Sequence, residues 1–198
     1  MKPQIDKQLI EKAINGNTEA FGKIYFALRG SIYGFAYRML KDVSAAENIT
    51  QDAFMFLIEN PQRFDAAKGE LLPFLCGIAR NKIIAHLRKH GTKLETLEDE
   101  IGKFEALENS KDSPLNALLH QELTQKLEEK IAQLAPYQRE VLILREIEEL
   151  PYLEIAKITE TDLNQVKIRI HRARKRLAKK LKSYLSESEE KYYEVSRN

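Results

Sequence analysis

The sequence has no tryptophan, a single cysteine, 8 glycines and 6 prolines among its 198 residues. Cys76 cannot form a disulfide within the chain and lies in the most apolar stretch, so we expect a small buried side chain rather than a redox centre. That stretch, Leu71 to Ala79, is the longest uncharged apolar run and is far shorter than the roughly 18 residues of a membrane span. The composition excludes collagen-like and low-complexity classes. These absences leave a folded chain without membrane insertion, and the polar N-terminus, which lacks a secretory signal, predicts a cytoplasmic protein.

Charge is sorted along the chain, although the formal net charge is only +2. Residues 163–182 hold 9 basic and no acidic side chains, whereas 91–114 hold 3 basic and 7 acidic, and 115–162 hold 5 and 10. So basic a segment indicates a polyanionic partner, because Lys and Arg release counterions from phosphates. A solvated helix face is the alternative, but such faces usually mix both signs.

Apolar residues recur at three- and four-residue spacing almost throughout, which predicts an all-α fold. We expect two small helical domains, each with its own core: residues 1–90 and 115–185, joined by an acidic linker over 91–114 and followed by a tail over 186–198. The expected helices span about 4–14, 19–40, 44–59 and 73–89, then 114–134, 137–148, 152–158 and 163–185. Ser44 and Glu47 form a capping box that predicts the start of the third helix.

The last two predicted helices have the outline of a helix-turn-helix. Asp162, with Gln165 three residues later, is typical of a helix N-terminus. The inner face of the last helix is an apolar stripe, and its outer face offers amide and basic groups that match base edges and phosphates in the DNA major groove. The candidate DNA contacts are Asn164, Gln165, Lys167, Arg169, Arg172, Arg174 and Lys175. A basic coiled-coil or membrane-surface helix is the less favoured alternative, because large apolar side chains are missing along most of the inner face.

Several stretches resemble bacterial sigma factors of the sigma-70 family, extracytoplasmic-function type. In the second domain these are Leu134–Arg145, Leu150–Ile158 and Val166–Leu177, which are similar to the reader of the minus-thirty-five promoter element. In the first domain, Ala46–Phe54 resembles the helix that grips core RNA polymerase, while Phe74–Asn81 and Leu87–Lys89 resemble the minus-ten reader. The resemblance covers about residues 5–182. It implies a promoter-specificity subunit that binds core RNA polymerase and promoter DNA and directs transcription initiation, and it leaves open whether an anti-sigma factor binds.

The resemblance also implies roles for individual residues. Core polymerase would contact Glu47, Asn48, Gln51 and Asp52, a face that spacing alone would assign to solvent. Minus-ten DNA would contact Phe64, Lys68, Phe74, Arg80, Asn81, Lys82, Arg88 and Lys89. The basic members of this set offer phosphate contacts, and the two phenylalanines either stack on an unstacked base or pack in the core. Glu160 stands where the family usually has glycine, so we expect an unusual turn there.

Two other functions remain as alternatives. A free-standing helix-turn-helix regulator would bind its operator without polymerase, usually as a dimer. A metal-dependent nucleic-acid hydrolase could use His86 and His90, whose spacing suits zinc, but no further ligand cluster accompanies them. The sequence also has no Gly-rich phosphate loop and no Gly-x-Ser-x-Gly motif. We therefore expect no enzymatic activity, no cofactor and no metal.

Overall fold

The computed structural model describes residues 5–67, 69–91 and 117–195, with side chains described for 5–67, 69–91 and 125–182. These residues form helices and no strand, which confirms the all-α prediction. Apart from Gly91, the predicted linker over 91–114 lies outside the described residues, and so does Lys68.

The first lobe packs three helices, preceded by a short one, around a common core. Its elements are α1 (Lys7–Ile14), α2 (Thr18–Leu40), α3 (Val43–Glu59), the 3-10 turn η1 (Pro61–Arg63) and α4 (Leu71–Lys89). The predicted capping box at Ser44 is wrong. Asp42 caps α3 instead, accepting a hydrogen bond from the backbone N–H of Ala45 at 2.9 Å. A carboxylate at this end also interacts favourably with the helix dipole, which a serine hydroxyl does not.

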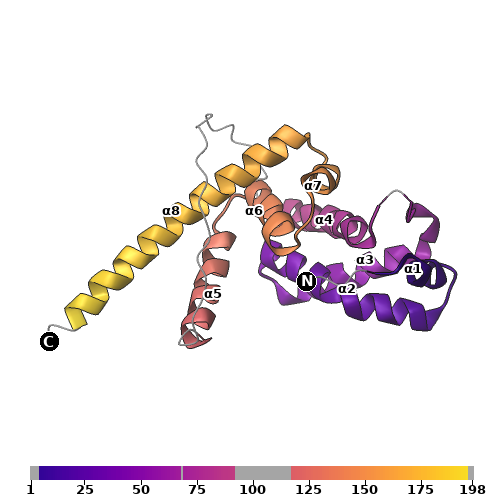
Figure 1. Ribbon diagram of the computed structural model, residues 1–198, viewed down its shortest axis with the longest axis horizontal. Helices are drawn as coiled ribbons and strands as arrows, with labels where there is room; N and C mark the ends of the chain where they lie inside the picture. The colour runs from indigo at the N-terminus through magenta and orange to yellow at the C-terminus, as the bar shows by residue number, and fades with distance from the viewer. Residues whose placement is uncertain (1–4, 68, 92–116, 196–198) are drawn as a thin grey trace.

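The second lobe contains α5 (Ala117–Ala132), α6 (Pro136–Leu142), the π-helical turn η3 (Ile143–Ile147), α7 (Tyr152–Thr159) and α8 (Leu163–Val195). The single helix expected over 137–148 is thus α6 followed by η3, and the π turn is marked by the bond from the Glu148 N–H to the Ile143 carbonyl at 2.9 Å. Helix α8 does not end near Leu185 but continues to Val195, so residues 186–195 of the expected tail are helical. Figure 1 shows α8 projecting well beyond the body of the molecule.

The two lobes pack against each other. Helix α4 of the first lobe contacts α7 of the second, and α2 contacts α5 and α6 (Figure 1). Buried side chains of both lobes, such as Ile83 and Ile155, belong to one continuous cluster. The two lobes thus share buried surface in this structure, whereas the division into domains over 1–90 and 115–185 stays a prediction. A lobe of this size buries only a modest share of its apolar surface by itself, so joining the lobes adds burial that neither has alone.

Candidate nucleic-acid interface

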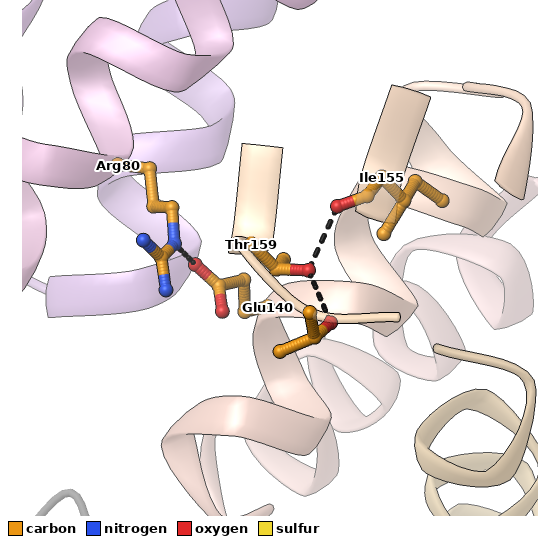
Figure 2. Close-up of polar contacts among 5 residues, drawn as sticks. Arg80, Glu140, Ile155 and Thr159 are labelled. Atoms are coloured by element: carbon orange, nitrogen blue, oxygen red, sulfur yellow. Dashed lines mark hydrogen bonds and ion pairs between the residues drawn. The ribbon is translucent and has the colours of Figure 1, made fainter. Parts of the chain in front are cut away.

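The turn between α7 and α8 is held by polar groups from four consecutive residues. Glu160 is the left-handed residue that ends α7, with φ of 54°. Thr159 is buried, and its hydroxyl donates to the Ile155 carbonyl at 2.8 Å while lying 2.9 Å from the Thr161 hydroxyl (Figure 2). The carboxylate of Asp162 then accepts from the Gln165 N–H at 2.8 Å, as the sequence predicts. The unusual turn expected at Glu160 is present, because a glutamate occupies a conformation that favours glycine.

Helix α8 separates a buried face from an exposed one. Val166, Ile170 and Ala173 are buried against the second lobe, in agreement with the predicted stripe. The first outward residues, Asn164, Gln165 and Lys167, are exposed. The start of the helix therefore presents two amides and one ammonium group to solvent.

Two of the candidate arginines on α8 already have partners within the second lobe. The Arg169 guanidinium lies over the Tyr137 ring at 5.6 Å. The Arg174 guanidinium pairs with Glu146 through Nε at 3.1 Å and through a shorter Nη2 contact, and this hydrogen bond raises the pKa of Arg174. Arg172 is half-buried and Lys175 is exposed. Exposed pairs such as Arg174 with Glu146 contribute little to stability.

The candidate minus-ten residues lie on α4 and before it, in three different environments. Asn81, Arg88 and Lys89 are exposed. The Lys82 ammonium donates to Asp52 on α3 at 2.8 Å. Arg80 faces the other lobe, where its Nε donates to the Glu140 carboxylate of α6 at 2.7 Å (Figure 2).

Phe64 and Phe74 pack on each other, with ring centroids 5.2 Å apart and planes at 61°. Phe64 is buried, whereas Phe74 is half-buried. Of the two roles left open for these rings, the arrangement favours core packing for Phe64. Phe74 is the more exposed of the two residues.

The four candidate polymerase contacts lie on the outward face of α3. Glu47, Asn48, Gln51 and Asp52 are all exposed, because the opposite face, with Ala46, Ile49 and Ala53, is buried. The structure thus brings these four side chains together on one polar and acidic surface.

Arg139 and Glu140 of α6 are residues that the sequence analysis missed. Glu140 is only 3% exposed, and burial raises the pKa of its carboxyl group, against the opposing effect of Arg80. The Arg139 guanidinium donates to the Met39 carbonyl of the first lobe at 2.8 Å, and burial lowers its pKa. The sequence did contain a signal for these two residues, because they directly precede the apolar run Val141–Leu144. Charged side chains in a helix that is largely buried need partners of opposite charge or hydrogen bonds.

The two histidines considered for a metal stack on each other at the end of α4. The His86 and His90 rings are 4.1 Å apart, and Nδ1 of His90 lies 2.8 Å from the His86 carbonyl. Within the described residues, no group of three or more His, Cys, Asp or Glu side chains is arranged to hold a metal ion. The described helices also include none long and apolar enough to cross a membrane.

Comparison with known proteins agrees with this arrangement. Residues 24–93 match the family described as Sigma-70 region 2, and residues 124–177 match Sigma-70, region 4. The chain is 32% identical over 187 residues to the ECF RNA polymerase sigma factor SigW of Bacillus subtilis, covering 89% of this chain and 96% of the relative. It is also 30% identical to the RNA polymerase sigma-H factor of Pseudomonas aeruginosa, covering 92% and 97%. The chain belongs to the extracytoplasmic-function sigma factors. This confirms the predicted resemblance.

Solved structures share the fold of this sigma factor. CnrH, solved in complex with the cytosolic domain of CnrY, has a TM-score of 0.66 at 21% identity, covering 91% of this chain and 99% of that one. The sigma factor RpoE of Bartonella quintana, solved with the anti-sigma factor NepR, has a TM-score of 0.63 at 23% identity, covering 83% and 98%.

Family membership also carries the function: a sigma factor binds core RNA polymerase and directs transcription initiation at promoters. A free-standing regulator is not favoured, because the chain matches sigma-70 region 2 as well as region 4.

Proposed function

We propose that α8 reads the upstream promoter element, that α4 contacts the downstream one, and that α3 attaches the sigma factor to core polymerase. The observation that carries the proposal is the exposed start of α8. Asn164 and Gln165 point outward from a helix that Asp162 caps and that Val166 anchors in the lobe. Side chains at this position of a recognition helix meet base edges, and amides pair with adenine.

The basic residues further along α8 serve a different purpose. Arg172, Arg174 and Lys175 lie where a recognition helix leaves the groove beside the backbone, so they contact phosphates. Arg169 belongs to the early turns and joins Gln165 in reading bases once it leaves the Tyr137 ring. The Glu146 carboxylate holds Arg174 until a phosphate takes its place.

On the first lobe, Asn81, Lys82, Arg88 and Lys89 contact the minus-ten strand, Arg80 contributes when the lobes separate, and Phe74 offers a ring for an unstacked base. Glu47, Asn48, Gln51 and Asp52 meet a basic surface of the polymerase, since their own surface is polar and acidic.

The sigma factor acts through binding and leaves RNA synthesis to the core enzyme. It acts in the cytoplasm, where core polymerase and promoter DNA are found.

An anti-sigma factor is a further proposed partner. The supporting fact is that CnrH was solved with the cytosolic domain of CnrY and RpoE with the anti-sigma factor NepR. A partner of this kind would hold the sigma factor away from polymerase.

The proposed assignment is tested by reconstituting the full chain with core polymerase and footprinting the holoenzyme on promoters selected from genomic fragments. We expect two protected regions and an opened duplex at the downstream one, neither of which core alone produces. A chain that protects a symmetric site as a dimer without core would instead be a regulator.

A further inference from the structure

Helix α6 supplies two adjacent residues of opposite charge to the contact between the lobes. Arg139 donates to the Met39 carbonyl near the end of α2, at 2.8 Å. The same guanidinium also donates to the carbonyls of Ala132 and Leu134, which close the end of α5. Glu140 accepts from Arg80 of α4 at 2.7 Å. The lobes are therefore joined by directional polar contacts as well as by apolar packing.

The pair of Arg80 and Glu140 is shielded from water. The side chain of Glu140 is 3% exposed and that of Arg80 is 16% exposed. Figure 2 shows the two groups meeting between helices of different lobes. In such surroundings, removing one partner leaves the other charge buried without compensation, so the closed arrangement depends on both.

A second arginine, from α8, also acts on Glu140. Besides Arg80, the Arg169 side chain of α8 acts electrostatically on the Glu140 carboxylate and stabilises its charged form. One buried acid thus lies in the field of two arginines, one from each DNA-contacting helix proposed above. Other charges along this contact are grouped separately: Glu128 of α5 pairs with Arg38 and Lys41.

A carboxylate and a phosphate compete for the same guanidinium, because both are anions that accept its charge-assisted hydrogen bonds. While Glu140 accepts from Arg80 and α7 covers part of α4, a DNA strand cannot reach this guanidinium. We propose that Glu140 is an internal substitute for a DNA phosphate, which occupies Arg80 in the free sigma factor and keeps α4 closed to DNA until the lobes separate. The inference rests on the DNA-binding role proposed for α4.

The test compares charge reversals in the full chain without polymerase. Glu140→Arg places a second guanidinium opposite Arg80, and Arg80→Glu places two carboxylates together. Both variants should expand the protein, measured as radius of gyration by small-angle X-ray scattering. The charge swap Arg80→Glu with Glu140→Arg restores an opposite pair and should return the radius to that of the parent. Arg80→Glu does not add repulsion against Arg169, so it remains informative if circular dichroism shows that Glu140→Arg is unfolded.

DNA binding is then measured by fluorescence anisotropy with a mixed-sequence single-stranded 20-mer. Glu140→Arg should bind at least about tenfold more tightly than the parent, since an opened α4 adds several phosphate contacts. The control is Glu129→Arg, which makes the same change in net charge at an exposed position that pairs with Lys126 in the same helix. Adding Arg80→Ala to Glu140→Arg should remove part of the gain.

Three results would overturn the proposal. These are an unchanged radius in both single reversals, a charge swap that stays expanded, and an affinity gain in Glu140→Arg no larger than that of Glu129→Arg. The proposed promoter function has its own test, footprinting of the holoenzyme. If that footprint is present while the free variants fail here, the sigma factor reads promoters but Glu140 does not restrain it.

Discussion

Asp52 and Lys82 lie on neighbouring helices, and the ammonium group donates to the carboxylate at 2.8 Å. The first is a proposed contact for polymerase and the second for DNA, so the two surfaces meet along the seam between α3 and α4. The side chains are 55% and 39% exposed, which makes the pair a weak contributor to stability. Each residue can therefore be changed to test function without unfolding the lobe.

Reversing charge on α3 should weaken attachment to core polymerase. The double variant Glu47→Lys with Asp52→Lys removes two acids from the proposed interface and is expected to lower core affinity at least about tenfold. The matched control is Glu11→Lys with Glu19→Lys, two exposed acids elsewhere on the same lobe. Affinity is measured by titrating labelled core, with helix content checked by circular dichroism. Equal affinities in both double variants would remove α3 from the interface.

Base reading and phosphate binding on α8 should fail differently. In holoenzyme, Gln165→Ala should lose about 1 to 3 kcal/mol of binding to the cognate upstream element and flatten discrimination at one or two base pairs. Lys175→Ala should weaken all sequences alike and reduce the slope of log affinity against log salt by about one. The two variants serve as each other's control. A uniform loss for Gln165→Ala across scrambled elements would make α8 an electrostatic anchor only.

The left-handed turn at Glu160 predicts a stabilising substitution. An L side chain in this conformation costs roughly 1 to 2 kcal/mol, while glycine loses about 0.5 to 1 kcal/mol more backbone entropy on folding than other residues. Glu160→Gly should therefore raise the free energy of unfolding in urea by about 0.5 to 1 kcal/mol. Glu160→Ala keeps the strained backbone but removes the charge, so it should give no such gain. Equal gains in both variants would assign the effect to charge.

Burial of Glu140 predicts a pH-dependent contribution to stability. Because burial raises the pKa of Glu140, the folded chain holds this proton more tightly than the unfolded chain. Its contribution to the free energy of unfolding is thus fully present below the ordinary glutamate pKa and is lost as pH rises through the raised value. Urea unfolding of the parent, measured against Glu140→Gln over this window, should show the difference falling as pH increases. A difference that is constant with pH would mean that Arg80 offsets burial completely.

The sequence by itself determined the parts of this protein that depend on neighbours in the chain. The helical repeat placed Val166, Ile170 and Ala173 on the inner face of α8. The cap at Asp162 was predictable because the backbone N–H of Gln165, in the first turn, has no partner within the helix and a carboxylate three residues earlier can accept from it. Local signals were less decisive where two caps compete, as with Asp42 and Ser44. Helix α8 continues past Leu185 to Val195. The regular spacing of apolar residues stops near Leu185, so the sequence pattern did not predict this extension.

Only the tertiary structure decided how the lobes meet. Arg80 and Glu140 are 60 positions apart, and Arg139 and Met39 are 100 apart. No periodicity or cap reports on such distances, because Arg80, Arg139 and Glu140 are each locally compatible with an exposed position. The sequence likewise left two roles open for Phe64, stacking on a base or packing in the core. Its contact with Phe74 of α4 favours packing. Contacts of this kind depend on which faces the two lobes bury together, and that is settled by shape and charge across the whole chain.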